Sequence, residues 1–319
     1  MSSRGARGQV VPGRAVEVVV PGSSANLGPG FDAVGLALGV HDVVQVRAVD
    51  PAEGVCVQVS GEGAGRVGTG EDSLLVRSVR AALHRAGAEQ PGLRVESRNG
   101  VPHGRGVGSS AAAVVAGVVA ASSLLEQPLA PQDVLDVSCA LEGHPDNAAA
   151  SLLGGLTLGW HEAGQDGSPD RWRAVRVEPH PDLCVLLCLP DAELSTARAR
   201  AMLPLQVPHA DAAHTAGRAA LLVEAVTRSP ELLLAATDDR LHQAQRAAAM
   251  PDSWRLLTAL RAAGHAAVVS GAGPSVVVLC GDAAASEAAA RVADAVGGWR
   301  PLRPGITRTG AVASVLAAR

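Results

Sequence analysis

The chain has 319 residues, 47% of them hydrophobic, and a formal net charge of −4 at pH 7, which predicts a globular protein of two ordinary domains, with one large domain as the alternative. The acidic balance and the scarcity of aromatic side chains disfavour nucleic-acid binding, since Phe31 is the only phenylalanine and tyrosine is absent. Lysine is absent too, which excludes a Walker A phosphate loop, the protein-kinase signature and Schiff-base chemistry with pyridoxal phosphate.

The first predicted strand, residues 15–20, leads into a turn over residues 21–38 that is rich in glycine, proline, serine and asparagine. This turn carries Asn26, Phe31 and Asp32, side chains that a plain connector does not need. An Asx-stabilised surface loop is the alternative. The next predicted elements are a hairpin of strands over 43–49 and 55–60, a helix over 74–86 closed by Gly87, and a strand over 93–97.

Residues 101–113, VPHGRGVGSSAAA, join a glycine-rich loop directly to a predicted buried helix over residues 111–125. Glycine at every second position lets a ligand approach the backbone closely. The first N–H groups of a helix have no intrahelical partner and the helix dipole favours negative charge there, so this junction suits an anion such as phosphate. The alternative is an ordinary glycine turn that Ser109 or Ser110 caps.

Carboxylates gather after this helix. The next predicted helix ends at Glu142, and Pro145 starts another that places His144, Asp146 and Asn147 around its first turn. Carboxylates beside a phosphate loop favour magnesium, although Asp146 could equally stabilise the helix dipole.

Strands are predicted over residues 172–177 and 183–189, and a boundary near residue 178 divides the chain into domains of residues 1–178 and 179–319. Cys184 and Cys188 fit burial in the second strand better than a zinc site, because no second pair of Cys or His completes one. The remaining predicted elements are helices over 196–203, 212–228, 240–250, 253–263 and 283–296, two strands joined by the turn at 270–275, and a last strand over 311–316.

No segment of the sequence suits membrane insertion. Residues 1–16 carry arginines but no apolar run of signal-peptide length, and the longest apolar run, residues 111–121, is too short to span a bilayer. The five cysteines are scattered and odd in number, which is typical of reduced thiols. We therefore expect a cytoplasmic protein that has neither a membrane nor a nucleic acid as partner.

Three stretches together resemble the motifs of the GHMP small-molecule kinases: PGSSANLGPGFDAVGLAL at residues 21–38, PHGRGVGSSAAA at 102–113 and SGAGPS at 270–275. In the second, Val107 stands where the family usually has leucine. A fourth stretch, EGHPDNAAASLLGG at residues 142–155, resembles the branch of the family that acts on homoserine. The resemblance implies a two-domain α+β fold, with a first domain similar to ribosomal protein S5 domain 2, a ferredoxin-like second domain, and the site between them.

The same resemblance implies roles for residues at the matching positions. The glycine loop would hold the phosphates of ATP, and Ser110 and Glu142 would bind Mg²⁺. The residues implied in phosphate binding are Pro102, Gly104, Arg105, Gly106, Val107, Gly108, Ser109 and Ser110. The residues implied in substrate binding are Asn26, Asp32, His144, Asp146, Asn147, Thr196, Arg200, Arg246 and Gly271.

The implied activity is ATP-dependent phosphorylation of the side-chain hydroxyl of L-homoserine to O-phospho-L-homoserine, a step of threonine biosynthesis. Asn26 and Asn147 would orient the hydroxyl, because phosphoryl transfer depends on positioning and charge neutralisation more than on a strong base. Arg200 and Arg246 would hold the α-carboxylate, whose geometry the guanidinium fork matches, and Asp32 the ammonium group. The alternatives are a GHMP kinase for another small alcohol and a non-catalytic binding protein of the same fold, and a homodimer is left open.

Overall fold

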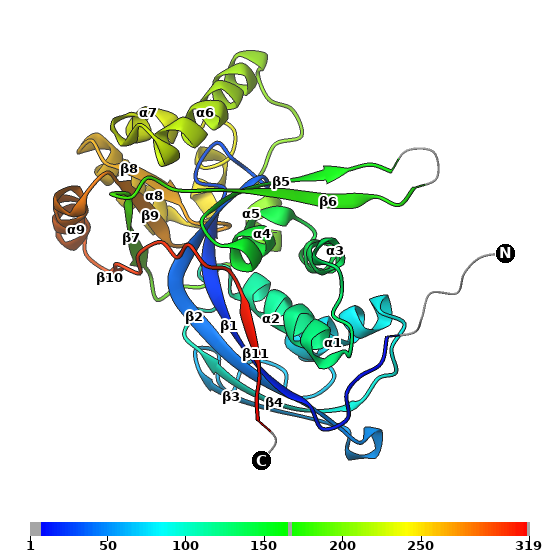
Figure 1. Ribbon diagram of the computed structural model, residues 1–319. Helices are drawn as coiled ribbons and strands as arrows, with labels where there is room; N and C mark the ends of the chain where they lie inside the picture. Colours follow the sequence, from blue (N-terminus) through cyan, green and yellow to red (C-terminus); the bar gives the residue numbers. More distant parts are fainter. Residues whose placement is uncertain (1–7, 165–167, 318–319) are drawn as a thin grey trace.

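The computed structural model describes residues 8–164 and 168–317, which form two lobes lying side by side (Figure 1). The N-terminal lobe contains β1 (Ala15–Ala25), β2 (Val34–Val49), the 3-10 turn η1 (Pro51–Glu53), β3 (Val55–Gly61), α1 (Leu74–Arg85), β4 (Gly92–Asn99), α2 (Ser109–Leu124), α3 (Pro131–Glu142), α4 (Pro145–Leu153), β5 (Leu156–Glu162), β6 (Arg171–Val177) and β11 (Val312–Val315). The C-terminal lobe contains β7 (Cys184–Leu189), α5 (Thr196–Arg200), α6 (His209–Thr227), η2 (Pro230–Leu232), α7 (Leu233–Ala236), η3 (Ala244–Ala249), α8 (Pro251–Ala262), β8 (Ala266–Val269), β9 (Val276–Cys280), α9 (Ala283–Val296) and β10 (Arg300–Leu302).

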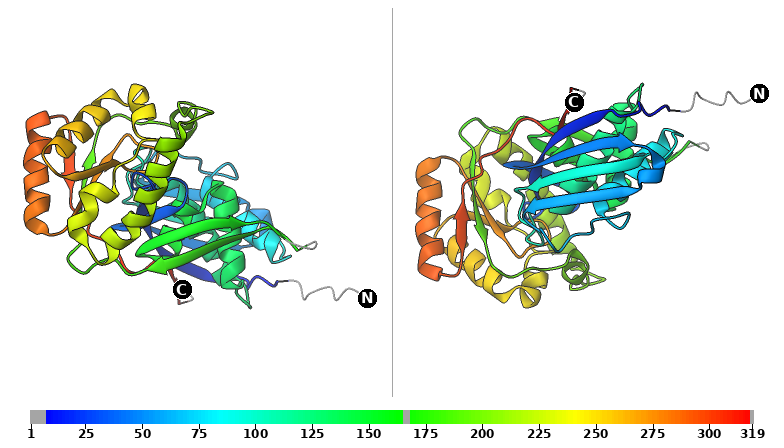
Figure 2. Two further views of the ribbon diagram at one scale, coloured as in Figure 1. Left: turned by 90° about the horizontal axis from the view of Figure 1, so that it is seen from above. Right: turned by 90° about the horizontal axis from the view of Figure 1, so that it is seen from below.

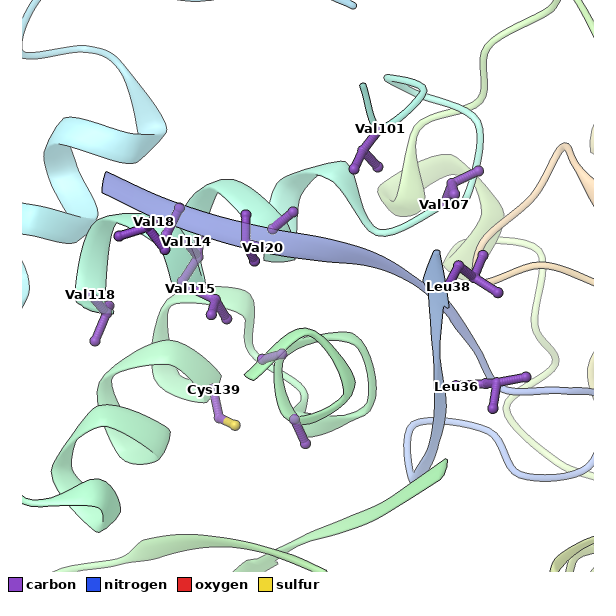
Figure 3. Packing of buried hydrophobic residues seen from close by; sticks show 14 of the residues in the cluster. Val18, Val20, Leu36, Leu38, Val101, Val107, Val114, Val115, Val118 and Cys139 are labelled. Carbon is purple, nitrogen blue, oxygen red and sulfur yellow. The ribbon is translucent and has the colours of Figure 1, made fainter. Parts of the chain in front are cut away.

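The N-terminal lobe is built on one mixed sheet with the strand order β11-β1-β2-β4-β3, to which β5 and β6 are added through β2. Helices α1 to α4 lie behind its strands in the view from below (Figure 2). The apolar helix α2 packs against β1 and the neighbouring helices, and Val18 and Val20 of β1 lie beside Val114 of α2 (Figure 3). Burying each such side chain contributes about 1.5–3 kcal/mol, so α2 and its N-terminus are held firmly on the sheet.

The C-terminal lobe has the β-α-β-β-α-β order of a ferredoxin-like domain. Its strands lie in the order β10-β7-β9-β8 and every pair is antiparallel. Helices α8 and α9 pack on this sheet through buried leucine and alanine side chains. The turn between β8 and β9 reaches the N-terminal lobe, where the N–H of Gly271 donates to the carbonyl of Ala25 at 3.1 Å.

Several sequence predictions are wrong in detail. Residues 43–49 and 55–60 do not form a hairpin, because β4 lies between β2 and β3 and pairs with β3 in parallel after the crossover helix α1. Residues 240–250 form turns and the short η3 instead of a helix, since the Asp239 side chain accepts hydrogen bonds from the backbone of residues 241–243. The predicted helix over 196–203 ends at Arg200, and β5 lies where the sequence predicts no strand.

The end of the described chain returns to the N-terminal lobe. β11 pairs with β1, where Val16 lies opposite Val315, and Leu38 forms a β-bridge with Ile306. The domain boundary near residue 178 stays a prediction. With that boundary, β11 would belong to the second domain by sequence and pair with β1 of the first domain. None of the helices in the described ranges is long and apolar enough to cross a membrane.

Candidate active site

A cavity of about 430 Å³ lies between the two lobes. Its wall combines the loop after β1, the glycine loop, the junction of α3 and α4, α5, and the turn between β8 and β9. Three predicted phosphate-loop residues, Pro102, Arg105 and Val107, do not line it. The predicted residues that line it are Asn26, Asp32, Gly104, Gly106, Gly108, Ser109, Ser110, Glu142, His144, Asp146, Asn147, Thr196, Arg200, Arg246 and Gly271.

Among the described residues, no side chain caps the N-terminus of α2, which follows the glycine loop. Gly108 occupies the N-cap position with φ +71°, in the left-handed region that glycine tolerates. Gly106 lies so close to the turn between β8 and β9 that a Cβ there would stand 2.8 Å from the carbonyl oxygen of Gly273. The first turn of α2 lines the cavity, so its unpartnered N–H groups provide the setting that an anion requires.

Ser110 and Glu142 form a pair of oxygen donors at one side of the cavity. Ser110 Oγ donates a 2.6 Å hydrogen bond to Glu142 Oε1. Burial raises the pKa of Glu142, and the hydrogen bond from Ser110 opposes that effect. A hydroxyl and a carboxylate are ligands that Mg²⁺ accepts.

His144, Asp146 and Asn147 are held by hydrogen bonds around the start of α4. His144 Nδ1 lies 2.5 Å from Asp146 Oδ1, which also accepts the N–H of Asn147 at 2.7 Å. Ser23 Oγ donates to Asn147 Oδ1 at 2.9 Å. Burial alone would lower the pKa of His144, but the hydrogen bond with Asp146 and the charges of Asp146 and Glu142 raise it. Asp146 thus holds both neighbours in place at the cavity wall.

Asn26 closes the loop after β1 and ties it to the C-terminal lobe. Its Oδ1 accepts the N–H of Asp32 at 2.9 Å, and its Nδ2 donates to the carbonyl of Gly271 at 2.9 Å. The φ angles of Asn26, Leu27 and Asp32 are 70°, 46° and 57°, a region uncommon for residues other than glycine. The two hydrogen bonds hold this strained loop in position beside the cavity.

Two side chains that are expected to bind the ammonium group and the carboxylate of the substrate, Asp32 and Arg200, form an ion pair with each other. Arg200 donates to both carboxylate oxygens of Asp32, at 2.8 and 2.5 Å. The link joins the lobes, because Asp32 follows β1 and Arg200 ends α5. The sequence gives no sign of this pair, in which each residue occupies the other's predicted ligand position.

Arg246 is a buried cation with a spare donor. Its side chain is 2% exposed and donates to the carbonyl oxygens of Gly271 at 3.0 Å and His242 at 3.2 Å. Its Nη2 has no hydrogen-bond partner within the described ranges. Burial lowers the pKa of Arg246, and the positive charge of Arg200 lowers it further. A buried guanidinium with an unused donor favours an anionic ligand.

A second cavity, of about 220 Å³, shares Ser109 and Ser110 with the first. Apolar side chains of β2, β3 and α1 form most of its wall, and Asp42 and Asn99 add polar groups. Asp42 accepts the backbone N–H groups of residues 100 and 101, at the start of the glycine loop. The sequence carries no motif for this cavity, because only the fold brings its strands and helices together.

Family profiles match both lobes. A profile described as GHMP kinases N terminal domain matches residues 73–155, and one described as GHMP kinases C terminal matches residues 213–297. The fold and the cleft therefore define a small-molecule kinase of the GHMP type. The two-domain α+β fold that the motifs imply is confirmed.

Individual relatives narrow the assignment. A homoserine kinase of Leifsonia xyli subsp. xyli is 47% identical over 303 residues, which cover 94% of this chain and 92% of that protein. One of Streptomyces coelicolor is 48% identical over 308 residues, covering 95% and 96%. The crystal structure of homoserine kinase from Cytophaga hutchinsonii is similar with a TM-score of 0.79 and 26% identity, covering 94% of this chain and 97% of that one. The chain belongs to the homoserine kinases of the GHMP kinase superfamily.

Proposed function

We propose that this chain transfers the terminal phosphoryl group of ATP to the side-chain hydroxyl of L-homoserine, giving O-phospho-L-homoserine and ADP for threonine biosynthesis. One observation carries the proposal: the same cavity contains an uncapped helix N-terminus, a carboxylate beside a hydroxyl, and a buried guanidinium with a spare donor. These groups suit a phosphate, a divalent cation and a carboxylate in turn. The relatives named homoserine kinase support the choice of substrate.

The glycine loop and the second cavity fit ATP. Phosphate oxygens would accept hydrogen bonds from the N–H groups at the start of α2, where Gly106 and Gly108 let the loop pack so closely on Ser270, Gly273, Ser23 and Asn147 that a Cβ at either position would clash. The nucleobase would occupy the apolar cavity that shares Ser109 and Ser110 with the cleft. Because the chain has no lysine, backbone N–H groups, hydroxyls, arginine and the cation would hold the phosphates.

Ser110 and Glu142 fit Mg²⁺, which commonly takes one or two protein oxygens together with phosphate oxygens. Within residues 8–164 and 168–317, no group of three or more His, Cys, Asp and Glu is arranged to hold a metal ion. When bound, the cation would neutralise phosphate charge. The hydrogen bond between the two side chains already brings both oxygens to the phosphate loop.

Asp32 and Arg200 are complementary to an amino-acid zwitterion, because the carboxylate of Asp32 can pair with its ammonium group and the guanidinium of Arg200 with its carboxylate. Homoserine would insert into this pair, with its ammonium group at Asp32 and its carboxylate between Arg200 and Arg246. Nη2 of Arg246 would then gain the acceptor that it lacks, which compensates the cost of its burial. Thr196, one helical turn before Arg200 on α5, lines the same wall and would contact the substrate there.

The hydroxyl of homoserine would lie between this clamp and the phosphates. Loose phosphoryl-transfer transition states depend on positioning and on charge neutralisation, so the proposal assigns no side chain as a strong base. Asn26 and Asn147 are both fixed by hydrogen bonds, which suits them to orient the hydroxyl. His144 and Asp146 would complete the wall around it.

The test is release of ADP from ATP and Mg²⁺ with L-homoserine, measured beside mevalonate, shikimate and sugars. Homoserine should give the highest kcat/KM. A higher value with another alcohol would favour a GHMP kinase of different specificity, and no release with any of them would favour a non-catalytic binding protein. The reaction would take place in the cytoplasm, and the enzyme would act as a monomer or a homodimer.

A further inference from the structure

Phe31 lines the cleft and is the only phenylalanine of the chain, yet the proposed function gives it no role. We propose that Phe31 is a positioning residue, whose ring holds the guanidinium groups of Arg200 and Arg246 where they receive the carboxylate of the substrate. This inference rests on the proposed function, which assigns that carboxylate to the two arginines.

Both guanidinium groups lie within cation–π distance of the ring. The Cζ atoms of Arg200 and Arg246 are 5.3 Å and 5.6 Å from its centroid. The face of an aromatic ring attracts a cation within about 6 Å. Two guanidinium groups that converge on one point repel each other, whereas the ring attracts both. Because the ring carries no net negative charge, it does not compete with the substrate carboxylate for the two guanidinium groups. A ring at this position therefore favours two converging arginines.

The C-terminal lobe fixes the ring from one side. The His242 ring stacks on Phe31 with centroids 4.2 Å apart and planes 3° from parallel. His242 Nδ1 lies 2.9 Å from Oδ1 of Asp239, whose side chain is fully buried. Burial alone would raise the pKa of Asp239, but hydrogen bonds from His242 and the backbone lower it. A charged carboxylate thus anchors His242, and His242 in turn supports the ring.

The N-terminal lobe fixes the ring from the other side. Phe31 precedes Asp32, whose backbone has φ 57° and whose N–H is held by Asn26 Oδ1 at 2.9 Å. Asp32 in turn pairs with Arg200, one of the two arginines near the ring. The ring and the acid both contact the arginines that would hold the carboxylate, so a change of the ring should affect homoserine binding and spare ATP binding.

The first test compares Phe31→Leu with Phe31→Tyr. Leucine keeps apolar bulk but has no π face, so we expect the KM for homoserine to rise about tenfold to thirtyfold through the loss of two cation–π contacts. In Phe31→Leu, the KM for ATP should stay within about twofold of the value of the unmodified protein. Phe31→Tyr keeps the aromatic face, so its KM values for homoserine and for ATP should both stay within about threefold of those of the unmodified protein. The matched control is Trp160→Leu, an exposed aromatic on β5 outside the cleft, which should leave both KM values unchanged. An equal rise in the KM for ATP, or a rise in Phe31→Tyr as large as in Phe31→Leu, would overturn the proposal.

The second test uses the single phenylalanine. Cell-free synthesis with fluorinated phenylalanines alters the ring at position 31 alone. Each added fluorine weakens the attraction of the face for cations while the ring shape is nearly kept, so the KM for homoserine should rise stepwise at constant KM for ATP. A flat homoserine KM across the series would overturn the proposal even if Phe31→Leu does not fold.

The unmodified protein separates this inference from the proposed function. If it releases no ADP with homoserine, the proposed function is wrong and the inference fails with it. If it is active and the fluorinated series is flat, only the role of Phe31 is wrong.

Discussion

Replacing Arg246 with alanine should weaken homoserine binding more than any other change at the carboxylate end of the cleft. The guanidinium is 2% exposed, and its Nη2 has no partner in the part of the chain that the structure describes. A substrate carboxylate would therefore contact a desolvated cation. Truncating such a pair costs about 2–4 kcal/mol, which corresponds to a rise in the KM for homoserine of about thirtyfold to thousandfold.

Arg200→Ala is the matched comparison. The side chains of Arg200 and Asp32 are 39% and 37% exposed, and their ion pair must open before substrate binds. The net gain from Arg200 is therefore smaller, and we expect a rise in the homoserine KM of about threefold to thirtyfold. Arg246→Lys should rescue poorly, since an ammonium group cannot reproduce the fork that contacts two carbonyl oxygens and a carboxylate together.

The assay is steady-state ADP release with homoserine varied at saturating MgATP, and then with MgATP varied at saturating homoserine. The KM for ATP should be nearly unchanged in both alanine variants, because the lost contacts are remote from the phosphates. Unmodified protein should handle the amino alcohol that lacks the carboxylate about as poorly as the Arg246→Ala variant handles homoserine. If it phosphorylates that amino alcohol as efficiently as homoserine, the carboxylate clamp is wrong.

Three further predictions concern other parts of the molecule. Glu142→Gln should lower kcat at least about a hundredfold with the fold intact, because charge neutralisation at the phosphates is a main catalytic effect; unchanged kcat at saturating Mg²⁺ would remove Glu142 from the site. Gly108→Val should abolish ATP binding, since the new Cβ would contact Ser23 Oγ and stand 3.0 Å from Asn147 Oδ1, which would displace the backbone N–H groups proposed to hold the phosphates; normal ATP affinity by calorimetry in a folded variant would contradict this. Burial raises the pKa of Asp42 to about 6, so ionisation of this carboxyl destabilises the fold as pH rises toward and past that value. Asp42→Asn should thus raise the free energy of unfolding at pH 8 by up to about 3 kcal/mol and change it little at pH 3, and equal effects at both values in denaturant unfolding would refute the cause.

Local signals in the sequence predict the phosphate loop and its surroundings well. Pro145 starts α4 as predicted, because the rules for helix ends depend on a few adjacent residues, whereas α2 begins at Ser109, two residues before the predicted start, with Gly108 and not a serine at the N-cap. Glu142 and Asn26 lie in one cavity, as the resemblance to the GHMP kinases implies. Their roles stay predictions.

Pairings over long sequence separations could not be predicted in this way. The alternation of Val55 to Ser60 is the same in a hairpin and in the parallel pair that β3 forms with β4. The ion pair of Asp32 with Arg200 joins residues 168 positions apart, and nothing in either neighbourhood distinguishes it from a surface charge. Phe31 is noticeable in the sequence as the only phenylalanine, but its contacts with Arg200 and Arg246 become visible only when the lobes meet.

The central claim is that the phosphoryl group goes to the side-chain hydroxyl of homoserine, and phosphorus-31 NMR of the products tests it most directly. With ATP, Mg²⁺ and L-homoserine, we predict a new phosphate monoester signal that is split by the side-chain methylene protons and grows in step with ADP. A spectrum with ADP and inorganic phosphate alone, or with a phosphorus signal that lacks this coupling, would contradict the account.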